Sequence, residues 1–316
     1  MNRLCLLGVC LCLCVLVAQS PTPPVKTRPP QTPAPPTSDT PIVIEVTRVN
    51  LLFTVADRKG RFVTNLAKED FEVVENKKKQ EILEFVAETD LPLRIGVLID
   101  TSNSIRERFR FELEAAAEFL NSLIQKERDK GLIISYDTDY SLVTDLTDNT
   151  ELLSKKLREL RPGGGTAMYD AIMYACREKL ALDRPMHKYR RAIVVISDGD
   201  DNASKYTRDQ ALEMAQKSEV VIYSISTNMT RTETEGDKVL KFFARETGGQ
   251  SFFPFKAQDM SQDFENIANE LRSQYSILFR PEPLITDGLF HAVDLKIKNR
   301  PGLIVRARKG YYAPKM

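Results

Sequence analysis

The chain has 316 residues, enough for one large domain or two small ones, each with its own core. Its 45 basic residues nearly balance its 44 acidic residues. This balance gives no electrostatic reason to expect nucleic acid or an anionic membrane as a partner, and we expect neither.

The first twenty residues differ from the rest of the chain. Arg3 is their only charged residue, and residues 4–18 form an unbroken apolar run. A basic start, a short apolar run and small residues near position 20 predict a secretory signal peptide over 1–20. The alternative is an uncleaved membrane anchor. After signal cleavage we expect no transmembrane helix, and a protein that is secreted, periplasmic or held at the cell surface.

The cysteines agree with export. Four of the five lie in the first twenty residues, so a mature chain keeps only Cys176 and has no internal disulfide. Cys176 falls on the same helical face as Met168, Ile172 and Ala175. This pattern favours a buried core thiol over a nucleophile.

Two segments with β patterns flank the middle of the chain, 42–90 and 274–316. Before the first, residues 21–41 hold nine of the seventeen prolines, which predicts an extended linker. The first flank predicts a bulge near Thr47 and Arg48 and a hairpin around Asn76–Lys79. We interpret the three lysines there as a solvated hairpin tip, with a binding patch as the alternative. Neither flank suffices for its own core, so we predict that both pair into one small β module.

Between the flanks, residues 91–273 alternate between short apolar runs and helical stripes. The runs are rich in Ile and Val, as in strands buried on both faces of a parallel sheet. Four strands are expected at 94–99, 132–136, 192–197 and 220–226, and a last one at 248–255. Helices are expected at 105–124, 152–160, 167–182, 208–217 and 260–273. This order predicts an α/β fold, a doubly wound and mostly parallel sheet with helices on both faces.

Three loops carry the polar residues that suggest chemistry. The first loop is Asp100-Thr101-Ser102-Asn103-Ser104, the second is Gly163-Gly164-Gly165-Thr166, and the third is Ser197-Asp198-Gly199-Asp200-Asp201. We place each at the carboxyl end of a predicted strand. Ligands of open parallel sheets bind at this edge, so the three loops are expected to converge there.

These loops resemble a known family. Asp100, Ser102 and Ser104 match the D-x-S-x-S pattern of the von Willebrand factor A family, and Thr166 and Asp198 supply two further positions. Together they resemble the metal-ion-dependent adhesion site of integrin inserted domains, whose fold is Rossmann-like. The resemblance covers about residues 91–273. The flanks resemble a bacterial group of secreted proteins, through Glu69-Asp70-Phe71 before the domain and Arg308-Lys309-Gly310-Tyr311 after it.

The candidate ligands are all oxygen atoms, which suits Mg²⁺ or Mn²⁺ better than zinc or copper. The resemblance implies that Ser102 and Ser104 bind the ion directly and that the carboxylates act largely through water. Neutral ligands leave the ion short of negative charge, so it favours a carboxylate from a partner. We therefore expect an adhesion-type, protein-binding module with no catalytic residues.

Two other functions fit the sequence less well. The only histidines, His187 and His291, lie outside the three loops and are too few for a typical histidine zinc site. A phosphatase resembling the haloacid dehalogenase family is the first alternative, with Asp200 and Asp201 as Mg²⁺ ligands. That family has a general acid where this chain has Ser102, which cannot act as an acid at neutral pH. A scaffold subunit with a structural metal is the second alternative.

Overall fold

The computed structural model describes residues 48–87, 91–103, 109–228, 230 and 232–315. Residues 45–316 belong to one unit. The predicted signal peptide and the Pro-rich linker lie outside the described residues, as does Thr47 of the bulge expected near Thr47 and Arg48. Within the described part, no helix is both long enough and apolar enough to cross a membrane.

The middle of the chain forms a six-stranded sheet with the order β6-β5-β4-β7-β8-β9. Five of its strands are parallel, and β6 runs antiparallel at one edge. Every residue of β4, β7 and β8 is buried, as their continuous apolar sequences predict. The strands are β4 (Leu93–Asp100), β5 (Lys130–Tyr136), β6 (Tyr140–Thr147), β7 (Arg190–Ser197), β8 (Val220–Ser226) and β9 (Ser251–Phe252).

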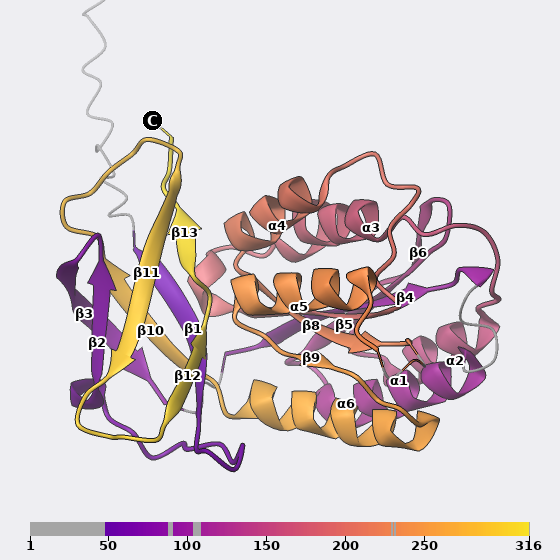
Figure 1. Cartoon of the computed structure of the whole chain (residues 1–316), viewed down its shortest axis with the longest axis horizontal. Helices are drawn as coiled ribbons and strands as arrows, with labels where there is room; N and C mark the ends of the chain where they lie inside the picture. Colours follow the sequence, from indigo (N-terminus) through magenta and orange to yellow (C-terminus); the bar gives the residue numbers. More distant parts are fainter. Residues whose placement is uncertain (1–47, 88–90, 104–108, 229, 231, 316) are drawn as a thin grey trace, which may run out of the picture. The chain divides into compact units, whose positions relative to one another are not determined.

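Helices cover both faces of this sheet, which confirms the expected α/β class. Successive residues of β7 alternate between two cores: Val194 packs with α1, α2 and α6, and Val195 packs with α3, α4 and α5. Figure 1 shows α1, α2 and α6 below the sheet and α3, α4 and α5 above it. The helices are α1 (Phe109–Leu123), α2 (Thr150–Glu159), α3 (Met168–Tyr174), α4 (Arg208–Lys217), α5 (Glu235–Thr247) and α6 (Ala257–Arg272).

A π-helical segment, η3 (Ala175–Leu180), continues α3 and carries Cys176. This thiol is fully buried and free, and burial raises its pKa well above the ordinary value. The prediction of a core thiol is confirmed. A short turn, η4 (Met186–Lys188), then leads into β7.

The flanks form a seven-stranded antiparallel sheet, larger than the small module that the sequence suggested. Strand β10 lies between β1 and β3, and β11 pairs with β2, so strands from the two flanks are interleaved in one sheet. Their inward side chains form a third core. The elements are β1 (Val49–Ala56), η1 (Lys68–Asp70), β2 (Phe71–Glu75), β3 (Lys78–Val86), β10 (Tyr275–Arg280), β11 (Phe290–Ile297), β12 (Ile304–Ala307) and β13 (Gly310–Tyr312).

The predicted hairpin is present between β2 and β3. Its turn consists of only Asn76 and Lys77, both with positive φ, which is the geometry that matches the twist of the flanking strands. Lys78 and Lys79 belong to β3, and the Lys79 ammonium pairs with Glu72 across the hairpin. The lysines therefore mark an exposed hairpin end.

Three elements of the α/β domain differ from the sequence prediction. Strand β6 and helix α5 were not predicted, and β9 has two residues where eight were expected. Strand β9 is short because Gly248 ends α5 in the left-handed region, so the chain reaches the sheet only at Ser251. Strand β6 lacks a continuous apolar run because it lies at the sheet edge and is half exposed.

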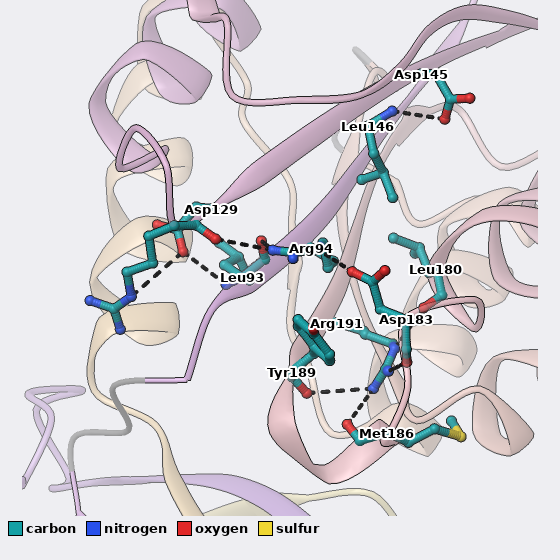
Figure 2. A network of polar contacts seen from close by, with 11 residues as sticks. Leu93, Arg94, Asp129, Asp145, Leu146, Leu180, Asp183, Met186, Tyr189 and Arg191 are labelled. Carbon is teal, nitrogen blue, oxygen red and sulfur yellow. Dashed lines mark hydrogen bonds and ion pairs between the residues drawn. The ribbon is translucent and has the colours of Figure 1, made fainter.

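Buried arginines occupy the amino ends of β4 and β7 (Figure 2). The Arg191 guanidinium donates to the carbonyls of Leu180, Asp183 and Met186. Arg94 pairs with the Asp183 carboxylate at 2.5 Å. These contacts commit both guanidinium groups to holding structure at the amino ends of the two strands.

Candidate metal centre

Asp100, the last residue of β4, is fully buried at the centre of the candidate site. One carboxylate oxygen accepts the Ser102 backbone N–H at 2.8 Å, and the other accepts the Ser197 hydroxyl at 2.6 Å. Burial raises the pKa of Asp100 to about 6, against the opposing effect of these hydrogen bonds. A negative charge held this deep is one that a cation would stabilise.

Hydrogen bonds join the three loops in a ring. The Gly163 N–H donates to the Thr101 carbonyl, which connects the second loop to the first. Just after the third loop, the Asn202 N–H donates to the Thr166 carbonyl, and the Asn202 side-chain oxygen accepts the Thr166 N–H. The bond from Ser197 to Asp100 closes the ring. The loops therefore converge as the sequence analysis expected.

Of the five predicted site residues, the structure describes four. Asp100 and Ser102 are in direct contact, and Ser102 and Thr166 are buried. Asp198 lies close enough to Asp100 for its charge to raise the pKa of that carboxyl. Ser104 lies outside the described residues.

The second loop corrects one expectation. It does not follow a strand: it follows α2 and precedes α3. It reaches the carboxyl edge because it packs on the turn between β5 and β6, where the Thr138 hydroxyl accepts the Gly165 N–H. Gly164 has a φ of +86°, and a Cβ there would lie 2.9 Å from Asp137. The glycines thus let the loop approach this turn.

The third loop depends on Gly199, which has a φ of +83°. A Cβ at this position would lie 2.3 Å from the Gly236 carbonyl oxygen, in the first turn of α5. Its N–H donates to the Ser197 hydroxyl, the same group that donates to Asp100. The close approach of α5 therefore fixes the loop that carries Asp198.

We predict that Gly199→Ala destabilises the protein by more than about 2 kcal/mol, because a methyl group meets both a forbidden φ and a backbone oxygen. Urea unfolding measures this loss. Gly163→Ala is the matched control, since its Cβ would have no heavy atom within 4 Å. We expect the control to stay within about 0.5 kcal/mol of the parent protein. Equal stability of the two variants would contradict the role assigned to Gly199.

The loop between β8 and α5, which the sequence analysis missed, is joined to the site because the Thr227 N–H donates to the Ser197 carbonyl. The Asp237 carboxylate in α5 accepts hydrogen bonds from the Ser226 hydroxyl and the Asn228 amide, both at 2.7 Å. Thr234 caps α5, with Asp237 three residues later. This capping pattern and Gly248 at the helix end were the sequence signals for α5.

Carboxylates gather around this edge. Desolvation raises the pKa of Asp200, and the nearby charges of Asp198, Asp237 and Glu235 raise it further. No group of three or more His, Cys, Asp or Glu side chains suited to a metal ion occurs in the described part of the chain. The predicted site has two carboxylates and relies on hydroxyl oxygens for the rest. An oxygen-only set of this kind fits a hard divalent cation.

The Asp201 carboxylate is used in hydrogen bonds that hold the third loop in place. It accepts the Tyr169 N–H at the start of α3, and the N–H and hydroxyl of Ser204. These bonds fasten the third loop to α3. The carboxylate is thereby committed to structure, which weakens the alternative in which Asp200 and Asp201 form a phosphatase metal pair.

The fold and the loops define an α/β domain with an oxygen-rich site at the carboxyl edge of a mostly parallel sheet. Residues 95–200 match the family model described as von Willebrand factor type A domain. Residues 95–200 are therefore similar to a von Willebrand factor type A domain.

Two solved structures and one curated relative are similar to parts of this chain. A von Willebrand factor type A protein from Catenulispora acidiphila is 14% identical, with a TM-score of 0.50 over 78% of this chain and 73% of that one. Proximal thread matrix protein 1 from the mussel byssus, with a zinc-occupied MIDAS motif, is 15% identical, with a TM-score of 0.49 over 60% and 47% of the two chains. An uncharacterized protein of Borreliella burgdorferi is 29% identical over 143 residues, 42% of this chain. The match spans only 39% of that relative.

Proposed function

We propose that the chain binds Mg²⁺ or Mn²⁺ through Asp100, Ser102, Ser104, Thr166 and Asp198, and that the ion recognises an acidic group on a partner protein without turnover. We also propose an exported protein, with a signal peptide over 1–20, a linker over 21–41, a von Willebrand factor A domain over 91–273, and flanks 42–90 and 274–316 that act as one β module.

The observation that carries the proposal is the ring of hydrogen bonds that gathers the three loops around the buried Asp100 carboxylate. A buried carboxylate with a second one nearby attracts a cation. The hydroxyls of Ser102, Ser104 and Thr166 add oxygen atoms without adding charge. An ion held in this way keeps affinity for an external carboxylate.

Hydrolysis has less support. The three loops contain no histidine, lysine or cysteine that would act as a base or nucleophile. Ser102 stands where the phosphatase family has its general acid, and the Asp201 carboxylate is engaged by Tyr169 and Ser204. Binding therefore explains these residues better than catalysis.

We expect the purified mature chain to capture its partner from an extract of the source cells only when Mg²⁺ or Mn²⁺ is present. Excess acetate should compete, because it supplies the same carboxylate chemistry. Ser102→Ala and Thr166→Ala should each abolish capture. Ser141→Ala, an exposed serine of β6, is the matched control and should retain it. Phosphate release from p-nitrophenyl phosphate should stay at background.

Two outcomes would favour the alternatives. Capture that ignores chelator and both loop variants would favour a scaffold with a structural metal or none. Metal-dependent phosphate release that is lost with Asp100→Ala would favour a phosphatase.

A further inference from the structure

A cavity of about 390 Å³ lies between the start of α1 and the segment that ends α2. Its apolar lining consists of Phe109 and Leu113 from α1, and of Leu160 and Pro162 after α2. Its polar lining consists of Arg110, Glu114, Arg158 and Arg161. The cavity thus has an apolar base and a rim with three guanidinium groups and one carboxylate.

The rim carries unbalanced positive charge. Arg158 and Glu114 neutralise one another through a two-pronged ion pair, with distances of 2.9 to 3.2 Å. The Arg161 guanidinium donates to the carbonyls of Arg158 and Leu160, which hold it in place without cancelling its charge. Arg110 is exposed and forms no ion pair within 4.0 Å among the residues that the structure describes, although its charge acts on the Glu114 carboxylate. Two positive charges remain to attract an anion.

Both walls of the cavity continue into the candidate metal centre. Pro162 directly precedes Gly163, whose N–H donates to the Thr101 carbonyl in the first loop. Helix α1 is the first helix after that loop, so its beginning lies at the carboxyl edge of the sheet. A partner segment whose carboxylate reached the metal would have this cavity within the reach of its neighbouring residues.

We propose that the cavity is the second contact for the same partner segment, and that it takes an apolar side chain whose neighbour is acidic. The apolar side chain enters between Leu113 and Leu160, and the neighbouring carboxylate meets Arg110 and Arg161. This inference rests on the proposed metal-dependent function and names the chemistry of its partner. A single metal–carboxylate contact selects poorly among acidic surfaces, whereas a desolvated apolar anchor supplies selectivity.

The test uses the full mature chain, labelled with ¹⁵N, and synthetic nonapeptides in the presence of Mg²⁺. A reference peptide has one aspartate among glycine and serine. The test peptides add a Leu-Glu pair at two, three or four residues from that aspartate. We expect one spacing to bind at least fivefold more tightly than the reference, with chemical-shift changes at Leu113 and Leu160.

Variants separate the cavity from the metal. Arg110→Glu should remove the fivefold gain and leave binding of the reference peptide unchanged. Lys155→Glu is the matched control, because it reverses one exposed charge on α2 outside the cavity, and it should keep the gain. If both variants lose the fivefold gain in affinity, the gain comes from the overall electrostatic field of the protein and not from the cavity. That result would overturn the inference.

The remaining outcomes distinguish this inference from the proposed function. If the reference peptide binds with Mg²⁺ but no Leu-Glu peptide binds better, the cavity is not the second contact and the metal function stands. If the Leu-Glu peptides bind equally well with chelator, the cavity acts without the metal and the inference is overturned. If the reference peptide does not bind with Mg²⁺, the proposed function itself fails.

Discussion

A chain that begins at residue 91 is expected to keep its α/β sheet and to lose ordered structure in β10, β11, β12 and β13. Strand β10 would lose both neighbours, β1 and β3, and β11 would lose β2. The Tyr275 ring, fully buried here, stacks on Phe53 with a centroid distance of 5.2 Å and contacts Phe71. Removal of residues 1–90 deletes both rings, so the third core cannot form.

Hydrogen exchange measured by mass spectrometry tests this expectation. Peptides from 275–312 should be protected in the full chain and exchange almost completely in the shortened chain. Removal of residues 1–41 alone is the control and should leave their protection unchanged. Continued protection of 275–312 without residues 1–90 would show that the C-terminal strands are stable alone, and would contradict the shared core.

The second large effect is expected for Asp100→Asn. This change keeps the size of the side chain and removes the charge nearest the centre of the three loops. Affinity for Mg²⁺ and Mn²⁺ should fall about 10- to 100-fold, the loss typical of a group that acts on a metal through its surroundings. Titration calorimetry measures it, with circular dichroism to show that the variant is folded.

Asp200→Asn is the matched control for this measurement. Asp200 is an exposed carboxylate in the third loop and is not among the proposed ligands. Its removal should lower affinity only a few fold, through the general electrostatic field. Equal losses in the two variants would mean that Asp100 has no special place in the site.

Continuous apolar runs predicted the central strands well. Strand β8 coincides with its predicted range, and β4 and β7 extend theirs by one or two residues. These strands are buried on both faces, so their pattern does not depend on which neighbours they have. Strand β6 is an exposed edge strand, and its mixed sequence gives no such signal. Local pattern therefore locates the centre of a sheet better than its edge.

The first and third loops of the site could be predicted because each directly follows a strand, and neighbouring strands of a parallel sheet place the loops after them side by side. The ends of β4 and β7 are neighbours in a parallel pair, which brings Asp100 and Ser197 together. The second loop follows a helix, so its position depends on packing against Thr138 and Asn202, far away in sequence. Helix α5 supports the third loop through the close approach of the Gly236 backbone to Gly199, and spacing in the sequence alone does not predict this contact.

The flank motifs also acquire a physical meaning. The Arg308 guanidinium donates to the carbonyls of Asn50 and Gln216 and pairs with Glu219, so one buried residue contacts β1 and the segment around α4. The Tyr311 hydroxyl donates to the buried Glu75 carboxylate, which also contacts His291. These residues join strands from both flanks. Such contacts link segments far apart in the sequence, so the pattern of a single strand does not predict them.

The most direct test of the central claim is a crystal structure of the mature chain grown with Mn²⁺ and measured at an anomalous wavelength for manganese. We predict one strong anomalous peak among the three loops, within bonding distance of hydroxyl oxygens of Ser102, Ser104 or Thr166, and with Asp100 and Asp198 close by. No peak at this edge, or a main peak elsewhere on the chain, would contradict the account.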